Sequence, residues 1–438
     1  MPSNILKKHF YQIKKGGIVT LLKKILSLFF IILRSPLFLI SIFVVIIIRL
    51  ISPWFLVRWA EIPSGRIGHL AKHIELYLND CEEGINLPKK KYIDFFYLGT
   101  RHVVANNQLL KMWKRTITIR SNWQLKPIDK INQFLNIFIT GGDKHKIILT
   151  LRDINNLLEK YKPHLNFTEE EENKGQKALK DFGIEKGNKF VCLLVRDSGY
   201  LNRHGGTGRE GHDQYNRNWS YHNFRDGDID RYILACEELA KRGYYVFRMG
   251  VNVLKPLKSS NPKIIDYANL NRSDFMDIYL GAKCTFCIST VAGFDEVPNI
   301  FRKPIAYLGV PIALLETHNK NSLILTKSHI SKKTKKKLTL SEIFFSNTAT
   351  SLHTNEYTKN NVELKENEPE EIRDLAIEMD DRLNGKWKET DEDIILQKKF
   401  WFIFEENIKN LNLKEPLHGE IKARFSAKYL RENKNWIR

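Results

Sequence analysis

Apolar residues along most of this chain form short runs typical of buried strands, with helical repeats between them. Residues 54–62 and 92–99 are rich in aromatic and β-branched residues, and between them Leu70, Ile74 and Leu78 lie on one face of a predicted helix. Strands that alternate with helices are typical of a parallel, doubly wound sheet. The pattern continues with a predicted helix at 106–114 and a strand at 116–119.

The same alternation resumes after a polar, helical segment at 168–189. We therefore expect one α/β domain over 61–180, a second over 181–350 and a helical extension over 351–438. In the second domain the pattern predicts strands at 190–195, 244–250, 263–267, 285–289 and 304–309, and helices at 229–242, 273–283 and 294–302.

One segment departs from this pattern, because residues 25–51 are apolar apart from two arginines. A membrane-spanning helix needs about 20 apolar residues, whereas Arg34 divides this run and Pro36 interrupts helices. Basic residues flank the run on both sides, as expected of cytoplasmic flanks. We expect residues 1–60 to associate with a membrane as a re-entrant hairpin or in-plane anchor, with a single span over 35–57 as the alternative.

Composition and charge support this interpretation. A hydrophobic content of 42% and an aromatic content of 11% indicate a folded protein. Of the net charge of +20, residues 1–60 supply nine Lys or Arg and no acidic residue. This favours an anionic membrane surface over nucleic acid as partner. The lysines at 327–337 lack interleaved aromatic residues, so we expect a solvated or lipid-facing loop there.

The five cysteines are scattered and odd in number, which indicates a reducing compartment. Cys284 and Cys287 form a CxxC pair inside an apolar run that predicts a buried strand. We interpret them as core residues rather than as a redox or metal site.

Polar residues and glycines follow four of the strands predicted in the second half. In open parallel sheets, ligands bind beyond the carboxyl ends of the strands. Arginine offers a planar fork to phosphate oxygens, and a helix N-terminus offers N–H groups. The pattern predicts a diphosphate site, although a structural ion pair between Arg196 and Asp197 is an alternative at the first strand end. The residues concerned are Arg196, Asp197, Arg248, Gly250, Asp266, Tyr267, Ser289, Thr290 and Gly293.

Two further segments sit near this edge. Asp226-x-Asp228 matches a metal-binding DxD motif superficially, but Asp228 comes just before a predicted helix, where capping explains an aspartate. The Gly- and His-rich segment 202–218 has no zinc-site spacing and predicts a flexible loop over the ligand.

The first domain offers two candidates for a general base. His69 follows Gly65 and Gly68 at a strand-to-helix turn, where a neutral histidine would accept a proton from a hydroxyl. Capping of the helix is the structural alternative for His69. His102, at the end of the second predicted strand, is the rival base.

Several of these segments resemble a family of bacterial proteins assigned as glycosyltransferases of surface-polysaccharide synthesis. The resemblance covers most of residues 60–310 and implies a GT-B-type fold, in which the second of two Rossmann-like domains holds a nucleotide sugar. Arg196 also stands where the wider fucosyltransferase-like group has an arginine against the donor diphosphate, although Leu193-Leu194 replaces the histidine of that group. The matching segments are "RIGHL…ELYL" (66–78), "LLVRDSGYL" (193–201), "YHNFRDGDIDRYILACEELAKRGYYVFRMG" (221–250), "IIDYA" (264–268), "SDFMDIYLGAKCTFCIST" (273–290) and "GFDEVPNIFRKP" (293–304).

Residues and resemblance together predict a metal-independent glycosyltransferase at the cytoplasmic face of the bacterial inner membrane. It would move a hexosyl or deoxyhexosyl group from a nucleotide sugar to a lipid-linked or polysaccharide acceptor, as in capsule or O-antigen synthesis, without a cofactor and without nucleic acid. A non-catalytic, membrane-tethered protein that binds sugar nucleotides or polysaccharide in an assembly complex is the alternative. The expected roles are catalysis for His69 and Asp197, diphosphate binding for Arg196, Arg248, Ser289, Thr290 and Gly293, and nucleoside or sugar binding for Asp266, Tyr267 and Glu296.

Overall fold

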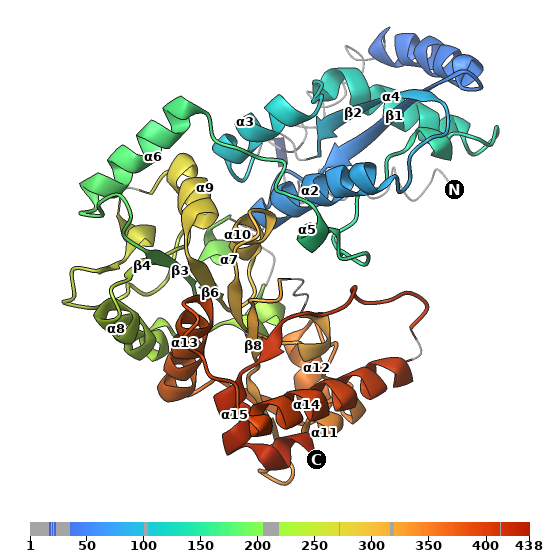
Figure 1. Ribbon diagram of the computed structural model, residues 1–438. Coiled ribbons are helices and arrows are strands. Elements are labelled where there is room, and N and C mark those ends of the chain that lie inside the picture. Colours follow the sequence, from blue (N-terminus) through green and yellow to red (C-terminus); the bar gives the residue numbers. More distant parts are fainter. Residues whose placement is uncertain are drawn as a thin grey trace. The chain divides into compact units, whose positions relative to one another are not determined.

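The computed structural model shown in Figure 1 falls into two compact units, each assembled from separate stretches of chain. The smaller unit comprises Met1–Glu61, Pro88–Tyr97 and Thr118–Ile147, and the larger comprises Ile62–Leu87, Leu98–Ile117 and Ile148–Arg438. Three stretches of the first predicted domain (62–87, 98–117 and 148–180) thus belong to the larger unit. The domain boundaries themselves stay a prediction. The structure describes residues 17, 18, 20, 22, 36–99, 104–204, 219–270, 272–315, 319–411 and 413–438.

In the smaller unit, β1 (Phe55–Ile62) and β2 (Lys91–Leu98) form a two-stranded sheet, so both predicted strands are confirmed. The strand predicted at 116–119 is reduced to one bridge between Ile119 and Phe96, because helix α3 (Asn107–Thr116) takes up the preceding residues. Trp59, Tyr97 and Leu125 form the core beside the sheet, with α4 (Asn122–Leu135) contributing Leu125.

Residues 36–51 are helical and belong to the smaller unit. Among the described residues, no helix combines the length and the apolar character needed to cross a bilayer. Most of the segment 1–35, on which the predicted anchor partly rests, lies outside the described residues.

The larger unit contains a seven-stranded parallel sheet in the order β11-β8-β7-β6-β3-β4-β5. All five strands predicted between residues 190 and 309 are present in it, so the predicted α/β class with a large parallel sheet is confirmed. The strands are β3 (Phe190–Leu194), β4 (Tyr245–Arg248), β5 (Ile264–Ile265), β6 (Phe286–Ser289), β7 (Ile305–Leu308), β8 (Leu323–Leu325) and β11 (Arg424–Phe425).

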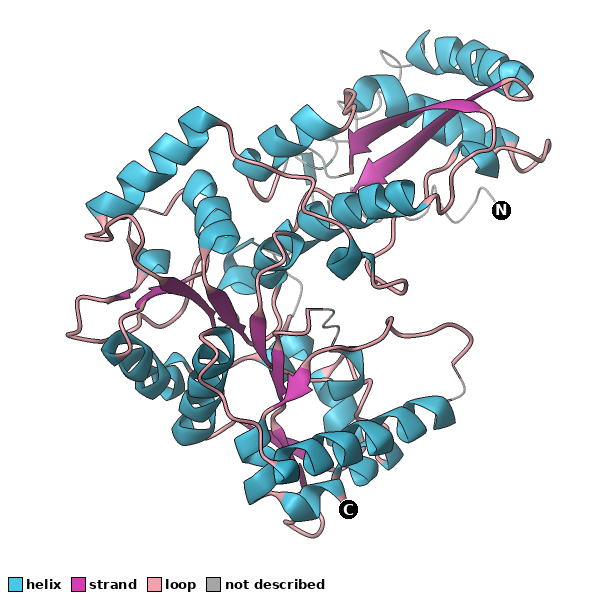
Figure 2. Cartoon of the chain, in the orientation of Figure 1, coloured by secondary structure: helices cyan, strands magenta, loops and turns pink. Residues whose placement is uncertain are grey.

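Helices cover both faces of this sheet, as Figure 2 shows, and each face has its own apolar core. Cys284 and Cys287 lie in the core that α6 and α9 share with the sheet, which confirms their interpretation as core residues. The helices of the larger unit are α2 (Ile67–Glu83), α3, α5 (Leu157–Lys160), α6 (Glu169–Asp181), α7 (Gly199–His204), α8 (Ile233–Lys241), α9 (Asp274–Lys283), α10 (Glu296–Ile300), α11 (Leu340–Phe345), α12 (Thr354–Lys359), α13 (Pro369–Leu383), α14 (Asp391–Asn410) and α15 (Ala427–Glu432).

The basic segment 327–337 contains more structure than a loop. It includes β9 (Ser328–Ser331), which pairs antiparallel with β10 (Val362–Lys365). Lys327 is buried, and its ammonium group donates to the carbonyl oxygens of Phe224 and Asp226. At this end of the segment the lysine is therefore a structural residue and not a solvated one.

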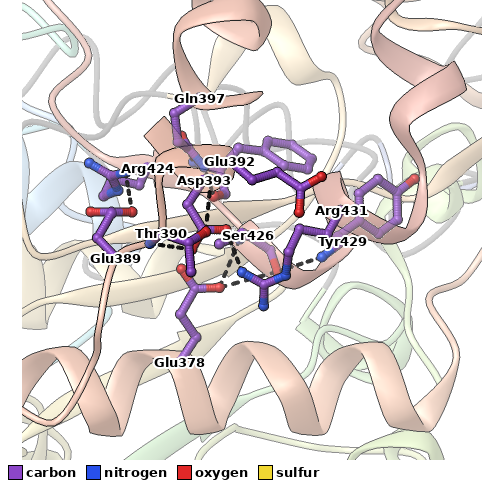
Figure 3. Close-up of polar contacts among 12 residues, drawn as sticks. Glu378, Glu389, Thr390, Glu392, Asp393, Gln397, Arg424, Ser426, Tyr429 and Arg431 are labelled. Carbon is purple, nitrogen blue, oxygen red and sulfur yellow. Dashed lines mark hydrogen bonds and ion pairs between the residues drawn. The ribbon is translucent and has the colours of Figure 1, made fainter. Parts of the chain in front are cut away.

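The C-terminal residues 351–438 contain the predicted helices but also join the sheet. β11 extends the edge beside β8, and α13 packs against α8. Figure 3 shows polar contacts that hold this part together, among them the pairs of Arg431 with Asp393 and of Arg424 with Glu389. Glu378 accepts from the Ala427 amide at 2.8 Å. Gln397 also accepts from the Phe425 amide at 3.1 Å. The segment is therefore an integral layer of the larger unit.

Candidate functional site

A pocket of about 220 Å³ in the larger unit lies beyond the carboxyl ends of β3, β4 and β6. The chain starts the sheet at β3, adds β4 and β5 on one side, and then returns to add β6, β7 and β8 on the other. The neighbours β3 and β6 therefore mark the point where the strand order reverses. In open parallel sheets, connections that leave such a point in opposite directions open a crevice for ligands.

The wall of the pocket combines apolar side chains with charged ones, and arginine dominates the charged part. The residues come from the start of α2, the strand ends, α7, the 3-10 turn η3 (Ser220–Arg225) and the start of α9. The apolar side chains include Ile67, Leu194, Val195, Leu201, Val251, Val253 and Phe294, and the charged ones are Arg66, Arg196, Asp197, Arg225, Arg272 and Asp277.

Arg196, predicted to bind a diphosphate, lines this pocket, and its side chain is almost fully buried. Its Nη1 is paired with the carboxylate of Asp226 and also donates to the carbonyl of His222 at 3.0 Å. Its Nη2 is buried without a hydrogen-bond partner among the described residues. The structural alternative of an Arg196–Asp197 ion pair is wrong, because the carboxylate that meets Arg196 is that of Asp226.

Arg225 and Arg272 repeat this feature. In both side chains the buried Nε lacks a hydrogen-bond partner among the described residues. Arg272 donates from Nη2 to Asp277 at 2.5 Å. Burial, together with the neighbouring charge of Arg196, lowers the pKa of Arg225 to about 10, so the group stays cationic at neutral pH. An unpaired buried donor is unfavourable, so three such donors around one pocket indicate an anionic ligand.

The same arginines set the charge of their neighbours. Burial, together with the positive charges of Arg225 and Arg196, lowers the pKa of His222 to about 3, so its imidazole is neutral. Burial raises the pKa of Asp226 to about 6, against the opposing effect of Arg196. The pocket therefore keeps a positive potential near neutral pH, which suits phosphate groups.

Arg248, the other arginine predicted to bind diphosphate, does not line the pocket. It is 1% exposed and pairs through Nη1 with Asp266 at 3.4 Å and through Nη2 with Asp197 at 3.8 Å. Asp266, predicted to bind nucleoside or sugar, also accepts from the Leu257 amide at 3.1 Å. Arg248 thus lies behind the wall of the pocket, where it holds two carboxylates in place.

Asp197 lines the pocket, and both of its carboxylate oxygens accept backbone N–H groups. Oδ1 accepts from Gly199 and Oδ2 from Leu254, each at 2.8 Å. A Cβ atom at Gly199 would collide with the backbone carbonyl of Asn252. The glycine is therefore required by the close approach of the segment around Asn252, and Asp197 fixes that segment beside β3.

The turn after β6 is buried and internally bonded. The Ser289 hydroxyl donates to Asp295 at 2.9 Å, and the amide of Ala292 donates to the same carboxylate at 3.0 Å. Thr290 accepts the backbone N–H of Arg196 at 2.8 Å through its hydroxyl. Of the three turn residues predicted to bind phosphate, only Gly293 lines the pocket.

The two remaining residues predicted to bind donor lie outside the pocket wall. Glu296, the first residue of α10, accepts from the buried ammonium group of Lys72 at 3.0 Å. Tyr267 is fully buried, and its hydroxyl donates to Asp277 at 3.2 Å. Asp277 in turn holds Arg272, so Tyr267 supports the pocket from behind.

His69 lies in the first turn of α2, three residues after Arg66, and does not line the pocket. Its Nδ1 is 3.1 Å from Nε2 of His73, and Nδ1 of His73 is 2.6 Å from the carbonyl oxygen of Thr150. A carbonyl oxygen only accepts, so Nδ1 of His73 donates and its Nε2 accepts from Nδ1 of His69. For two neutral rings, this chain leaves Nε2 of His69 as a proton acceptor, the state that a general base needs.

Other predictions for this region have different outcomes. Asp228 caps the 3-10 turn η4 (Ile229–Tyr232) by accepting from the Asp230 amide at 3.2 Å, which confirms the capping interpretation. In the part of the chain that the structure describes, no group of three or more His, Cys, Asp or Glu is placed to hold a metal ion. His102 and most of the segment 202–218 lie outside the described residues.

Sequence reasoning missed Arg66, Arg225 and Arg272. Arg225 stands one position before the DxD match, and Arg66 stands inside the glycine-rich turn that led to His69. Arg272 comes just before the N-cap of a predicted helix. A usable signal was an arginine just before α2 and α9 and at the end of η3, since the connections after parallel strands meet at one edge of the sheet.

Comparisons with known proteins find limited similarity. No protein-family profile and no curated protein matches the chain. Among solved structures, a glycosyl transferase family 9 protein from Veillonella parvula aligns with a TM-score of 0.35 at 10% identity, over 58% of this chain and 80% of that one. The E. coli ADP-heptose LPS heptosyltransferase II aligns with a TM-score of 0.32 at 12% identity, over 57% and 84%. Scores this low carry no argument about function, which must come from the pocket.

Proposed function

We propose that this protein is a glycosyltransferase whose larger unit binds the diphosphate of a nucleotide sugar in the arginine-lined pocket. One observation carries the proposal: Arg196, Arg225 and Arg272 all line one pocket at the point of strand reversal, and each has a buried N–H group without a hydrogen-bond partner among the described residues. Diphosphates carry several negatively charged oxygens, which match such donors in charge and in geometry.

The chemistry of transfer fits this arrangement. When the bond between the sugar and the diphosphate breaks, negative charge grows on the leaving phosphate oxygen, and fixed cations stabilise it. Arg196 and Arg225 supply these cations directly, while Arg248 and Asp197 hold the strand ends in register. The apolar wall, with Val251 and Phe294, offers a surface for the nucleoside base.

We assign the proton transfer from the acceptor hydroxyl to His69, oriented by His73. The hydrogen-bonded chain to the Thr150 carbonyl supports this assignment, since it leaves Nε2 of His69 as the acceptor. Asp197, the other residue predicted to be catalytic, has both oxygens engaged by backbone amides, so its proposed role is to orient the site.

The proposal includes an acceptor that is lipid-linked or a polysaccharide, and a location at the cytoplasmic face of a bacterial inner membrane. The basic, apolar N-terminal sequence supports this part. Neither a metal nor another cofactor is required, because the arginines supply the positive charge that a metal ion otherwise provides at a diphosphate.

Thermal denaturation of the full chain with UDP, GDP, ADP or CMP tests the binding step. We expect one nucleotide to raise the melting temperature, because a ligand at one hundred times its Kd stabilises the folded state by about 2.7 kcal/mol. If none of the nucleotides shifts the transition, the donor pocket is refuted. A nucleotide sugar of the matching base, incubated with acceptor, should then release free nucleotide; binding without release would identify the non-catalytic alternative.

Substitutions in α2 test the base. His69→Gln should keep nucleotide affinity and lower turnover by about 10²- to 10⁴-fold. His73→Gln retains an oxygen that accepts from Nδ1 of His69, whereas His73→Leu does not. We therefore expect the His73→Leu variant to lose more activity and to show a shifted pH profile relative to His73→Gln. Equal turnover of wild-type and His69→Gln protein would exclude His69 as the base.

A further inference from the structure

The helix over 36–51, dark blue in Figure 1, exposes several large apolar side chains. They recur at spacings of three and four residues, which places them on one side of a helix. Their exposed fractions lie between 44% and 76%. The residues are Leu39, Ile40, Phe43, Ile46, Ile47 and Leu50, with Trp54 just beyond the helix.

The opposite face of the same helix is already occupied. Ser41 and Val45 are buried, and Ile48 packs against the core of Trp59 and Tyr97. The described part of this helix is about 24 Å long at 1.5 Å per residue, less than the roughly 30 Å of a bilayer core. Because its own unit holds this stretch along one side, its outer face is the one that a partner can contact.

A second apolar element lies beside this helix. The last turn of α4 and the loop after it expose Phe134, Ile137, Phe138 and Ile139 by 55% to 74%. Arg49 joins the two elements, because its Nη1 donates to the carbonyl of Ile139 at 2.9 Å and its Nε to the side-chain oxygen of Asn132 at 3.0 Å. We call the outer helix residues, Trp54 and the four residues Phe134, Ile137, Phe138 and Ile139 the apolar surface.

The apolar surface belongs to a strongly basic unit. The smaller unit contains 17 Lys and Arg against 4 Asp and Glu, a net charge of +13, while the larger unit has 53 against 46, a net charge of +7. Lys89, Lys90 and Lys91 are exposed, and the ammonium group of Lys90 donates to the carbonyl of Ser52 at 2.7 Å, at the end of the helix. Apolar residues bordered by lysines are typical of helices that lie in the interface of an anionic bilayer.

We infer that the apolar surface docks in the plane of an anionic lipid bilayer, with the helix over 36–51 parallel to the membrane and the loop tip at Phe138 inserted beside it. A second copy of the chain is the less suitable occupant, because an isologous contact would bring two units of charge +13 together. The inference is independent of the proposed transfer reaction, since the apolar surface belongs to the smaller unit and none of the residues substituted below lines the pocket.

Vesicle flotation of the full chain tests the docking. We expect binding to phosphatidylcholine vesicles that contain phosphatidylglycerol, weaker binding to phosphatidylcholine alone, and a loss of binding as salt screens the lysines. Lys89→Gln with Lys91→Gln should weaken binding to the anionic vesicles by about fivefold per charge. Equal binding to both vesicle types, or none to the anionic ones, would contradict the inference.

The apolar contribution is tested by a matched pair of double variants. Ile137→Ser with Phe138→Ser should lower vesicle affinity by about tenfold or more for each side chain. Ile395→Ser with Phe402→Ser changes residues that are 62% and 67% exposed on α14 of the larger unit, and should have no effect. If the two double variants bind vesicles equally well, the apolar surface is not the contact.

Tryptophan fluorescence distinguishes this surface from the N-terminal segment. Residues 1–35 contain no tryptophan, whereas Trp54 is 76% exposed within the apolar surface. Lipids brominated on the acyl chain should quench the fluorescence, and Trp54→Phe should remove most of the quenched signal. Vesicle binding without quenching of Trp54 would show that residues 1–35 alone hold the membrane. A concentration-dependent dimer that Ile137→Ser with Phe138→Ser dissolves would show that the surface binds a second copy.

Discussion

The two units of this protein differ in their energetically unfavourable groups: the smaller unit exposes apolar side chains, and the larger unit buries charged ones. The smaller unit holds 17 of the 28 large apolar side chains that are exposed in the described part of the chain. The larger unit instead buries charge, with Arg196, Arg225 and Arg248 largely withdrawn from solvent around or behind one pocket. Exposed apolar area and buried unpaired charge both cost free energy in an isolated chain.

This difference indicates what each unit binds. An apolar surface with lysines around it gains free energy when lipid replaces water, whereas a buried arginine with an unpaired N–H gains free energy when an anion reaches it. The first kind of contact is broad and tolerates single substitutions. The second depends on a few atoms, so single substitutions should affect it most.

The largest effect is expected for Arg225→Met. Loss of the guanidinium removes charge-assisted hydrogen bonds to a diphosphate, which should weaken nucleotide binding by about 100-fold. The melting temperature without nucleotide should not fall, because burial already makes this charge costly in the folded state. Isothermal titration calorimetry and thermal denaturation measure the two quantities.

The control for Arg225→Met is Arg373→Met on α13, where the arginine pairs with Asp374 and does not line the pocket. Nucleotide affinity should be unchanged in this variant. A fall in melting temperature of Arg225→Met together with retained affinity would assign Arg225 to the structure and would remove the contrast between the two units.

A smaller effect separates the two faces of the helix over 36–51. Val45→Ala creates a cavity on the buried face and should lower the free energy of unfolding by about 2 kcal/mol. Phe43→Ala on the exposed face should change it by less than about 0.5 kcal/mol in solution. Urea denaturation followed by circular dichroism compares the variants. Equal losses would mean that Phe43 is packed against protein, and that the smaller unit does not present an apolar surface.

A last prediction concerns the pH dependence of the larger unit. Burial, reinforced by the neighbouring Glu296, raises the pKa of Asp295 from 3.8 to about 7. Because this pKa is raised in the folded state, the carboxyl favours folding below about pH 4, and this contribution is lost as pH rises through about 7. Asp295→Asn cannot ionise, so the melting temperature of the variant minus that of the wild type should increase from pH 5 to pH 8. If the difference in melting temperature between variant and wild type stays constant from pH 5 to pH 8, ionisation of the buried Asp295 carboxyl does not destabilise the folded state.

Local patterns in the sequence were sufficient for most elements of the larger unit. The strand β3 ends at Leu194, one residue before the change from Val195 to Arg196 predicts, and Asp228 caps η4 at the start of the helix predicted over 229–242. The C-terminal segment shows the limit, because the two residues of β11 are too few to give a pattern and join the sheet only through pairing with β8.

The candidate site could be predicted only in part. Arg196, Asp197 and Gly293 line the pocket as expected, since strand ends and the turns after them reach one edge of a parallel sheet. Arg248 is oriented away from it by Asp266 and Asp197, a choice that depends on side chains distant in the sequence. Arg225 enters the pocket from a 3-10 turn whose position no periodicity reveals.

The sequence by itself determined the order of strands and helices, the basic and apolar character of the N-terminal region, and the polar residues at the strand ends. Tertiary structure decided which charges meet, because Arg196 finds Asp226 thirty positions away instead of its neighbour Asp197. It also decided which side of the helix over 36–51 is covered. Periodicity identifies a buried face only by contrast with a polar one, and this helix is apolar on both sides.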